Sequence, residues 1–337
     1  MFIKNNYPLK QLNTFGIDVK ADTFAEFFSA QELSEILSRY ETIGLNKYIL
    51  GGGSNVLFVN DFKGIIIKNS IAGINVINED KDCIDIEAGA GVIWNEFVKY
   101  CIDKNFGGIE NLSLIPGTVG AAPIQNIGAY GQEQKETFIS LKGISLDNMQ
   151  RMEFSKKECK FSYRDSVFKN ELKNKFVITH VKFRLVKNPS VNLKYESVKD
   201  EVKNLGLKNP SIKDISDIVI RIRKNKLPDP LKIGNAGSFF KNPLLEIENY
   251  EQIKKSNVGI SGRKVGNFIK VPAAWLIEKC GWKGKTFGNV GVHDKQPLVI
   301  VNYGNANGQE ILDLAMEIKK SVLDTFGINL VEEVNII

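Results

Sequence analysis

Two glycine-rich segments carry residue types suited to holding an anionic group. The first, Gly51–Gly53, directly follows a predicted strand and is followed by Ser54 and Asn55. Consecutive glycines adopt positive φ at low cost and can present backbone N–H groups to an anion. The segment is not a P-loop, because no lysine follows the last glycine, and it does not match the GxGxxG fingerprint. Taken alone, it leaves a flexible turn as the alternative.

The second segment, residues 110–131, is longer and is also rich in small residues. Gly117, Gly120, Ala121 and Ala122 would let a flat aromatic ring or a pyrophosphate lie against the main chain. Such a long stretch without helical or strand periodicity is usually functional or disordered, and its apolar content argues against disorder. This second segment therefore favours a bound ligand.

Short strands are predicted to position both segments in the first half of the chain. β-Branched, apolar runs bounded by Gly, Asn or Asp predict strands at 47–50, 65–68 and 84–88, and two more around 138–146 and 176–186. One helix is indicated by the spacing i, i+3, i+4, i+7 of Trp94, Phe97, Val98 and Cys101.

The second half has a helical pattern. Apolar residues from Ile215 to Ile222 predict a helix that ends before Leu227-Pro228-Asp229-Pro230. A longer amphipathic helix is predicted from Ile311 to Phe326, closed by Gly327. We place the boundary between the two halves in 205–230.

The composition excludes several classes of protein. A length of 337 residues suggests two domains, and 43% hydrophobic with 25% charged residues is typical of a globular chain. No apolar run is long enough to span a bilayer, and the N-terminus lacks the apolar stretch of a secretory signal. Four dispersed cysteines predict reduced thiols and a cytoplasmic protein, with no association to a membrane.

Histidine content and net charge narrow the choice of ligand. Only His180 and His293 are present, so a metal site built on several imidazoles is nearly excluded, and we expect no metal. A net charge of +6 suits a small polyanion as well as a nucleic acid. Because no aromatic RNA-binding motif and no continuous basic helix face are found, we expect a small-molecule ligand and no nucleic acid.

Seven short strings along the chain resemble one known family. In order, they are Asn13-Thr14-Phe15-Gly16-Ile17, GGGSNVL at 51–57, IPGTVGAAPIQNIGAYG at 115–131, FSYRDS at 161–166, KLPDP at 226–230, NAGSFFKNP at 235–243 and AAWLIE at 273–278. Together they resemble the UDP-N-acetylenolpyruvoylglucosamine reductases, or UDP-N-acetylmuramate dehydrogenases, from about residue 10 to 335. An insert around 190–210 resembles the longer subtype, in which a tyrosine loop closes over the substrate.

The resemblance implies an α+β fold. It implies a two-part FAD-binding domain of the vanillyl-alcohol-oxidase (PCMH) type at 1–205, with lobes of about 1–70 and 71–205. A C-terminal α+β substrate-binding domain would follow at 206–327, and residues 328–337 would form a strand returning to the active site. We expect a monomer.

The resemblance also implies an activity: NADPH reduces UDP-N-acetylglucosamine enolpyruvate to UDP-N-acetylmuramate through FAD, in peptidoglycan precursor synthesis. Neither histidine lies in the glycine-rich segments, so noncovalent FAD is expected. The alternatives are an FAD oxidase of the same fold acting on a sugar or alcohol, and a non-catalytic binding protein for flavin or nucleotide sugar. An oxidase needs a base and a sensor should lose catalytic groups, whereas this chain keeps a proton donor, which favours reduction.

Three residues match the catalytic positions of the family. Arg164 would stabilise charge on the substrate carboxylate, although a salt bridge to Asp165 is its ordinary alternative. Ser238 matches the proton donor, and its ordinary alternative is a turn or N-cap serine. Glu333 matches the second acidic residue of a Glu-Pro-Glu-Val-Arg signature, but this chain has Val331-Glu332-Glu333-Val334-Asn335, which leaves the choice between Glu332 and Glu333 open.

The remaining implied site residues fall into two groups. Those matching the FAD-binding positions are Gly51, Gly52, Gly53, Ser54, Asn55, Gly117, Thr118 and Gly120. Those matching substrate contacts are Tyr130, Gln125, Tyr163, Tyr195, Arg223, Lys226, Asn242 and Gln296. For Arg223 and Lys226 the alternative is a solvated, basic helix end favoured by the helix dipole.

Overall fold

The computed structural model describes residues 2–39, 42 and 44–337. Its contacts divide the chain into two compact units, each assembled from three separate stretches. Unit 1 comprises Met1–Tyr7, Ala21–Gly53 and Phe62–Asn225, and unit 2 comprises Pro8–Lys20, Ser54–Asp61 and Lys226–Ile337. The domain bounds given above stay a prediction.

The first sheet of unit 1 ends at the glycine-rich segment. Its order is β1 (Phe2–Pro8), β2 (Lys20–Phe27), β5 (Phe62–Asn69) and β3 (Lys47–Leu50). β2 and β3 both run parallel to β5. Helix α1 (Ala30–Ser38) begins at Ser29, whose hydroxyl accepts the Glu32 N–H, and it buries Leu33 and Ile36 against the sheet. Because β3 ends at Leu50, the glycine-rich segment that starts at Gly51 is positioned by the end of this strand.

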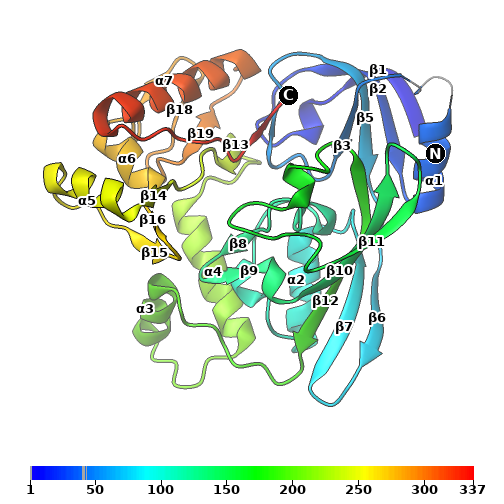
Figure 1. The fold of residues 1–337 in the computed structure, drawn as a ribbon, viewed down its shortest axis with the longest axis horizontal. Coiled ribbons are helices and arrows are strands. Elements are labelled where there is room, and N and C mark those ends of the chain that lie inside the picture. Colours follow the sequence, from blue (N-terminus) through cyan, green and yellow to red (C-terminus); the bar gives the residue numbers. More distant parts are fainter. Residues whose placement is uncertain (1, 40–41, 43) are drawn as a thin grey trace. The chain divides into compact units, whose positions relative to one another are not determined.

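The second sheet of unit 1 is antiparallel and carries the larger core. Its order is β11 (Arg151–Ser155), β10 (Phe138–Ser145), β12 (Phe176–Val186), β7 (Cys83–Gly89) and β6 (Ile74–Glu79). Helix α2 (Trp94–Asp103) lies beside this sheet in Figure 1 and packs Trp94 and Phe97 against Phe183. The Trp94 indole donates to the Leu112 carbonyl at 3.0 Å, which ties the helix to the long loop.

Two helices complete unit 1. Helices α3 (Glu196–Asn204) and α4 (Ile212–Lys226) share a buried cluster that includes Val198, Val202, Ile215 and Val219. The cluster places Tyr195 at the N-cap of α3 and Arg223 on the last turn of α4.

The stretch between α2 and β10 contains only short elements. They are the 3₁₀ turns η3 (Glu110–Leu112), η4 (Val119–Ala121) and η5 (Gln134–Glu136), with the hairpin of β8 (Gly128–Ala129) and β9 (Gln132–Glu133). Its lack of regular periodicity is therefore confirmed. The strands expected at 47–50, 65–68, 84–88, 138–146 and 176–186 are confirmed as β3, β5, β7, β10 and β12.

Unit 2 is built on an antiparallel sheet covered by helices. The order is β13 (Gly234–Ser238), β19 (Val299–Asn302), β18 (Val290–Val292) and β17 (Thr286–Phe287). Helix α7 (Gly308–Phe326) lies along β18 and β19 with α6 (Ala273–Lys279) at its side (Figure 1). The expected helix stop is confirmed, because Gly327 adopts φ +67° at the C-cap of α7.

Three smaller elements belong to unit 2. A sheet of β14 (Leu244–Glu246), β16 (Phe268–Lys270) and β15 (Arg263–Val265) packs with α5 (Ile247–Ser256). Near the C-terminus, β20 (Asn335–Ile336) runs parallel to β4 (Val56–Leu57). Two stretches far apart in the sequence are thereby joined in one unit.

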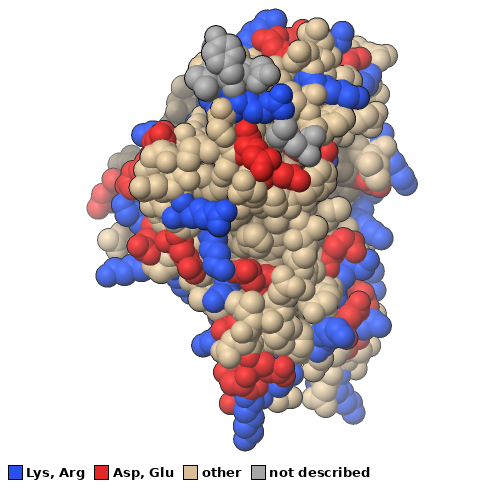
Figure 2. Space-filling model, turned by 90° about the vertical axis from the view of Figure 1, so that its right-hand side faces the viewer, with Lys and Arg blue, Asp and Glu red and all other residues tan. Residues whose placement is uncertain are grey.

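The surface carries charges of both signs. On the face drawn in Figure 2, Lys and Arg side chains lie among Asp and Glu side chains in small groups. The Arg184–Asp85 ion pair at 2.7 Å joins neighbouring strands β12 and β7, and Lys187, just after β12, pairs with Glu79 of β6 at 2.6 Å. Within the described residues, no helix is long and apolar enough to cross a membrane.

Candidate active site

The two glycine-rich segments lie in direct contact within unit 1. A Cβ atom on Gly51 would lie 2.8 Å from the Thr118 hydroxyl oxygen, and one on Gly52 would lie 3.0 Å from the Gly117 Cα. Gly53 and Gly117 have φ of +63° and +108°, a region that favours glycine. The structure therefore brings together residues of two separate loops that the sequence predicts to bind the cofactor.

Hydrogen bonds to the segment that follows β7 hold the second loop in place. The Val119 N–H donates to the Val92 carbonyl at 2.8 Å, and the Gly120 N–H donates to the Ala90 carbonyl at 2.9 Å. A Cβ on Gly120 would lie 2.5 Å from the Ala90 Cβ, so the approach requires glycine. The two glycine-rich segments thus pack backbone against backbone, with the Thr118 hydroxyl at their contact.

Tyr130 projects from a tight hairpin turn. Tyr130 and Gly131 link β8 to β9, and both have positive φ, +48° and +80°, as a type I′ turn requires. Ala129 pairs with Gln132 on either side of the turn. The backbone twist of the hairpin therefore fixes the direction of the Tyr130 side chain.

Arg164 lies in a second tight turn, between Ser162 and Asp165. The Ser162 N–H donates to the Asp165 carbonyl at 3.1 Å, and the Asp165 N–H donates back at 3.4 Å. Arg164 has φ +53°, at a turn position that ordinarily favours glycine or asparagine. Its guanidinium donates to the Gly128 carbonyl and lies 5.6 Å from the Tyr163 ring centroid. The Asp165 carboxylate accepts hydrogen bonds from Asn170.

Arg223, Arg164 and Tyr130 form a positively charged group in unit 1. Burial lowers the pKa of Arg223, and the positive charge of Arg164 lowers it further, while a hydrogen bond with Tyr130 acts in the opposite direction. Burial likewise raises the pKa of Tyr130. The Arg223 Nε is buried and has no hydrogen-bond partner, and within the described residues no carboxylate pairs with this side chain. Two cations whose charges repel each other in a partly desolvated place are unfavourable, so the group is suited to an anion.

A buried amide connects Tyr130 to the loop that carries Tyr195. The Nδ2 of Asn111, whose side chain is fully buried, donates to the Tyr130 carbonyl at 2.9 Å and to the Asn192 carbonyl at 3.1 Å. The Asn192 side chain in turn donates to the Gly131 carbonyl at 3.2 Å. The Tyr130 and Tyr195 rings meet edge to face with centroids 5.2 Å apart. Four predicted residues, Tyr130, Arg164, Tyr195 and Arg223, are thus connected in unit 1.

Gln125 and Tyr163, the other predicted substrate residues of unit 1, are both part-buried. Gln125 directly precedes the buried Asn126 in the second glycine-rich segment. Tyr163 precedes Arg164 in the same turn. Both therefore belong to the loops that carry Tyr130 and Arg164.

In unit 2, backbone hydrogen bonds bring the Ser238 and Glu333 segments together. Ser238 is the last residue of β13 and pairs with Val299 of β19. The next residue, Phe239, accepts the Glu333 N–H at 2.8 Å through its carbonyl. Phe240 and Glu332 form an antiparallel bridge, which continues the pairing. The C-terminal segment therefore returns to the strand that carries Ser238.

The two adjacent glutamates have different surroundings. Glu332 forms a part-buried ion pair with Lys319 of α7 at 2.6 Å. The Glu333 carbonyl accepts from the Asn55 side chain at 3.2 Å, and the Asn335 side chain donates to the Asn55 carbonyl at 2.9 Å. Ser54 precedes Asn55 at the start of the same stretch.

The other predicted residues of unit 2 are more dispersed. Asn242 caps α6, since its side chain accepts the Ala273 N–H at 2.9 Å. Gln296 lies in the turn before β19 and accepts the Val299 N–H at 2.9 Å through its carbonyl. Lys226 is exposed at the end of α4. Within the described residues, no hydrogen bond or ion pair joins these three to Ser238.

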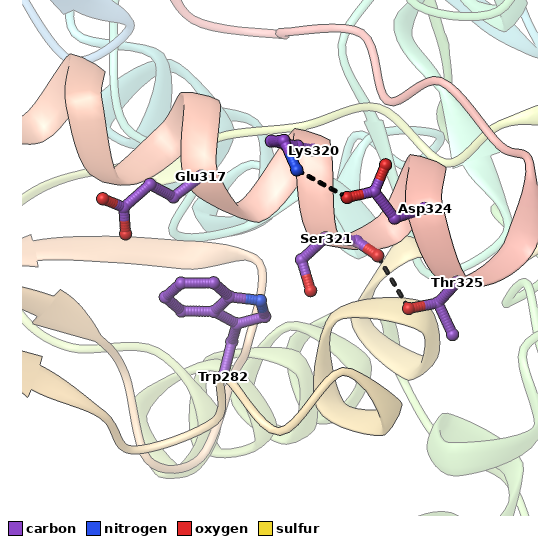
Figure 3. A pocket seen from close by; sticks show the side chains of 6 residues that line it. All are labelled: Trp282, Glu317, Lys320, Ser321, Asp324 and Thr325. Carbon is purple, nitrogen blue, oxygen red and sulfur yellow. Dashed lines mark hydrogen bonds and ion pairs between the residues drawn. The ribbon is translucent and has the colours of Figure 1, made fainter.

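A cavity of about 340 Å³ lies elsewhere in unit 2 (Figure 3). The Trp282 indole lies on one side of it and α7 on the other, where Lys320 pairs with Asp324 and Thr325 donates to the Ser321 carbonyl. None of the predicted site residues lines it. We therefore assign this cavity no part in the candidate active site. Across the described residues, no group of three or more His, Cys, Asp or Glu could hold a metal ion.

Sequence reasoning missed the buried amides that organise unit 1. Asn111 and Asn126 are both fully buried and hydrogen-bond across several loops. Asn126 lies in the segment 115–131, which resembles the reductase family, but a sequence motif does not reveal whether a side chain is buried. The only signal in the sequence was a polar residue within an apolar loop.

Comparison with known families gives two matches along the chain. A model described as the C-terminal domain of UDP-N-acetylenolpyruvoylglucosamine reductase matches residues 229–337. A model described as an FAD binding domain matches residues 21–147. The second match includes both glycine-rich segments.

Curated relatives match over the whole length. Proteins named UDP-N-acetylenolpyruvoylglucosamine reductase from Flavobacterium johnsoniae and Amoebophilus asiaticus are 48% and 47% identical, over 100% of both chains in each case. One of the same name from Pseudomonas savastanoi pv. phaseolicola is 42% identical over 99% of this chain and 98% of its own.

Among solved structures, the UDP-N-acetylenolpyruvylglucosamine reductase of Thermus caldophilus has a TM-score of 0.69 at 22% identity, over 100% of this chain and 99% of that one. At this identity the likeness shows a shared fold. With the FAD-binding match, it confirms the predicted α+β fold class.

Proposed function

Because the chain belongs to the UDP-N-acetylenolpyruvoylglucosamine reductase family, we propose that UDP-N-acetylglucosamine enolpyruvate is its substrate and UDP-N-acetylmuramate its product. The chain is an FAD-containing oxidoreductase of peptidoglycan precursor synthesis, with NADPH as its reductant and a small nucleotide sugar as its substrate. This substrate carries a diphosphate and a carboxylate.

The charge distribution in unit 1 is the observation that best supports this substrate. Arg223 is part-buried and interacts electrostatically with Arg164, has no carboxylate partner within the described residues, and has a buried, unpartnered Nε. An anionic substrate would compensate the two positive charges, and a guanidinium can bind a carboxylate or phosphate through two parallel hydrogen bonds. Tyr130, Tyr163 and Tyr195 would add hydroxyl and aromatic contacts from the same group of loops.

The two packed glycine-rich segments are the proposed binding place for FAD. Gly51–Gly53 and Gly117–Gly120, with the Thr118 hydroxyl, would hold the diphosphate and ring, and Ser54 and Asn55 would add side-chain donors. When bound, FAD supplies the hydride chemistry that carries two electrons from NADPH to the substrate. The chain's own groups must then bind, orient and protonate the substrate.

Hydride addition to the enolpyruvyl ether places negative charge on the α-carbon and its carboxylate. In our proposal, Arg164 stabilises that charge through hydrogen bonds to the carboxylate, and Ser238 donates a proton to the α-carbon. Glu333 would assist this step by stabilising the enolate that develops. The ion pair of Glu332 with Lys319 supports Glu333 in this role, because Glu332 is already engaged elsewhere.

The remaining assignments of residues and location also depend on membership of the reductase family. Lys226, Arg223, Gln125, Asn242 and Gln296 are proposed contacts to the phosphates, sugar or uridine. We also propose a cytoplasmic, monomeric protein that does not bind nucleic acid or associate with membranes. The reduced thiols of the described cysteines suit a cytoplasmic location.

Separate measurement of the two half-reactions tests the proposal. Purified protein should contain bound, oxidised flavin, and it should consume NADPH continuously only when UDP-N-acetylglucosamine enolpyruvate is present. Ser238→Ala should still allow NADPH to bleach the flavin, while substrate-dependent recovery of the flavin absorbance should slow by about 100- to 10,000-fold, because the proton donor is lost.

Three outcomes would contradict the assignment. Bleaching without substrate-dependent recovery would exclude this substrate. Rapid oxygen-dependent turnover of a sugar or alcohol would favour the oxidase alternative. If Ser238→Ala slowed both half-reactions equally, Ser238 would have a structural role only.

A further inference from the structure

Asn126 is a buried residue that the proposed chemistry does not use. Its side chain is fully buried, and its backbone adopts φ +45°, which asparagine tolerates better than most residues. It lies between the cofactor segment that ends at Ala122 and the hairpin that carries Tyr130. The hydrogen bonds of its side-chain amide show which segments it connects.

Every hydrogen-bonding group of the Asn126 amide is used. Nδ2 donates to the Ser162 carbonyl at 2.9 Å and to the Glu133 carboxylate at 3.0 Å. Oδ1 accepts from the Gln134 side chain and from the Lys135 N–H, both at 3.3 Å. An amide offers two donors and two acceptor sites, so this side chain is saturated. It connects the Arg164 turn, strand β9 and the turn η5.

The Arg164 turn needs support of this kind. Arg164 is held at φ +53°, a conformation that costs a non-glycine residue free energy and persists only where its surroundings enforce it. The Ser162 carbonyl, which opens the turn, is the atom that Asn126 binds. At the other end of the side chain, the guanidinium donates to Gly128 of the same hairpin that Asn126 fixes through Glu133.

The backbone turn and the guanidinium of Arg164 are therefore both held by hydrogen bonds that lead to one hairpin, β8–β9. A Cβ on Gly128 would lie 3.1 Å from the Arg164 Nη1, so the guanidinium lies directly over this glycine. A Glu133–Lys135 ion pair at 2.6 Å orients the carboxylate that Asn126 binds. If the amide were lost, the turn and the hairpin would be free to move relative to each other.

We infer that Asn126 is a positioning residue that fixes the Arg164 guanidinium in the orientation in which it meets the substrate carboxylate. The inference rests on the proposed role of Arg164. Asn126 touches neither substrate nor cofactor in this account, and its effect reaches the reaction only through Arg164. A displacement of about 1 Å at such a group can cost about 100-fold in rate.

Asn126→Asp in the flavin-loaded enzyme is the primary test. The substitution keeps the size of the side chain and its tolerance of positive φ, but it removes both donors and sets a second carboxyl against Glu133. We expect flavin recovery with UDP-N-acetylglucosamine enolpyruvate to slow by about 10- to 100-fold. Flavin content by absorbance should stay within twofold of the parent protein.

A second variant covers the possibility that the added carboxyl prevents folding. Asn126→Gly removes the amide without adding charge, and glycine adopts φ +45° readily. It should slow the same half-reaction to a similar degree. Agreement between the two variants would assign the effect to the lost amide and not to the new charge.

Asn69→Asp provides a matched control in the same unit. Asn69 is also buried, and its Nδ2 donates to the Ile178 carbonyl at 2.8 Å while its Oδ1 accepts the Ile71 N–H at 3.2 Å. These partners belong to the sheet region and not to the Arg164 turn. We expect a lower melting temperature with a flavin recovery rate within threefold of the parent.

A double-mutant cycle separates positioning from general loosening of the fold. If Asn126 acts through Arg164, Asn126→Asp should slow an Arg164→Lys protein by less than about threefold, because the guanidinium is already gone. Equal slowing in both backgrounds, or equal slowing by Asn69→Asp, would overturn the inference. A wild-type rate for Arg164→Lys alone would instead overturn the proposed role of Arg164.

Discussion

The two units hold their proposed site residues by different means. In unit 1, Tyr130 and Arg164 lie on irregular loops with positive φ, and buried amides, Asn111 and Asn126, connect those loops. In unit 2, Ser238 and Glu333 lie on extended segments joined by backbone hydrogen bonds. One arrangement depends on particular side chains and the other on the main chain.

This difference determines how each region should respond to substitution. Backbone pairing survives a change of side chain, so the C-terminal segment can keep its register although Glu332 and Asn335 replace the proline and arginine of the family signature. A loop held by side-chain amides has less tolerance, because removing an amide removes the hydrogen bonds that connect the loop to its neighbours. Substitutions in the two units can therefore test the comparison directly.

The largest effect is expected at Glu333. Glu333→Gln should slow flavin recovery with substrate by about 100-fold or more, because a group that assists proton transfer is lost. Glu332→Gln should change this rate by less than threefold, since it removes a part-buried ion pair with Lys319 that is worth about 1 kcal/mol or less of stability. Stopped-flow absorbance and thermal unfolding of both variants provide the measurement.

The pair also tests the backbone register of unit 2. If Glu332→Gln proved the slower enzyme, the C-terminal segment would be shifted by one residue relative to Phe239 and Phe240. The alternation of side chains along the segment would then place Glu332 in the catalytic role.

A smaller effect is expected at Arg223. Arg223→Lys keeps the charge but loses the planar fork, so the KM for the substrate should rise by about 10-fold, equivalent to about 1.4 kcal/mol. The kcat should fall less, because the proposed contact binds a group remote from the reacting carbon. A lysine that bound substrate as well as the arginine would show that the buried Nε contributes nothing to recognition.

Sequence alone predicted the regular elements well. Strand β3 was expected at 47–50 and found at Lys47–Leu50, because a β-branched run bounded by glycines leaves little alternative. The long C-terminal helix and its stop at Gly327 followed from apolar periodicity and from glycine's preference for positive φ. The contact between the two glycine-rich segments was implied only by the family resemblance.

Other features could not be predicted from local patterns. Unit 2 contains Pro8–Lys20 and Ser54–Asp61 because of long-range pairing, such as β4 with β20, which no local window contains. The roles of Asn111 and Asn126 depend on burial and on partners from several loops. From sequence alone, an asparagine in a loop predicts a turn. Only the folded structure distinguishes an asparagine whose side chain connects other loops.

The smallest effect is expected at Asn335, and it tests the backbone-held arrangement most directly. Two hydrogen bonds reach the Asn55 carbonyl from this residue, one from its N–H at 3.1 Å and one from its side chain at 2.9 Å. Asn335→Ala removes only the second, so the free energy of unfolding should fall by about 1 kcal/mol and the flavin recovery rate should stay within threefold. Denaturant unfolding and the half-reaction assay measure the two quantities. A large loss of rate with unchanged stability would mean that this strand, like the loops of unit 1, depends on a side chain for its position.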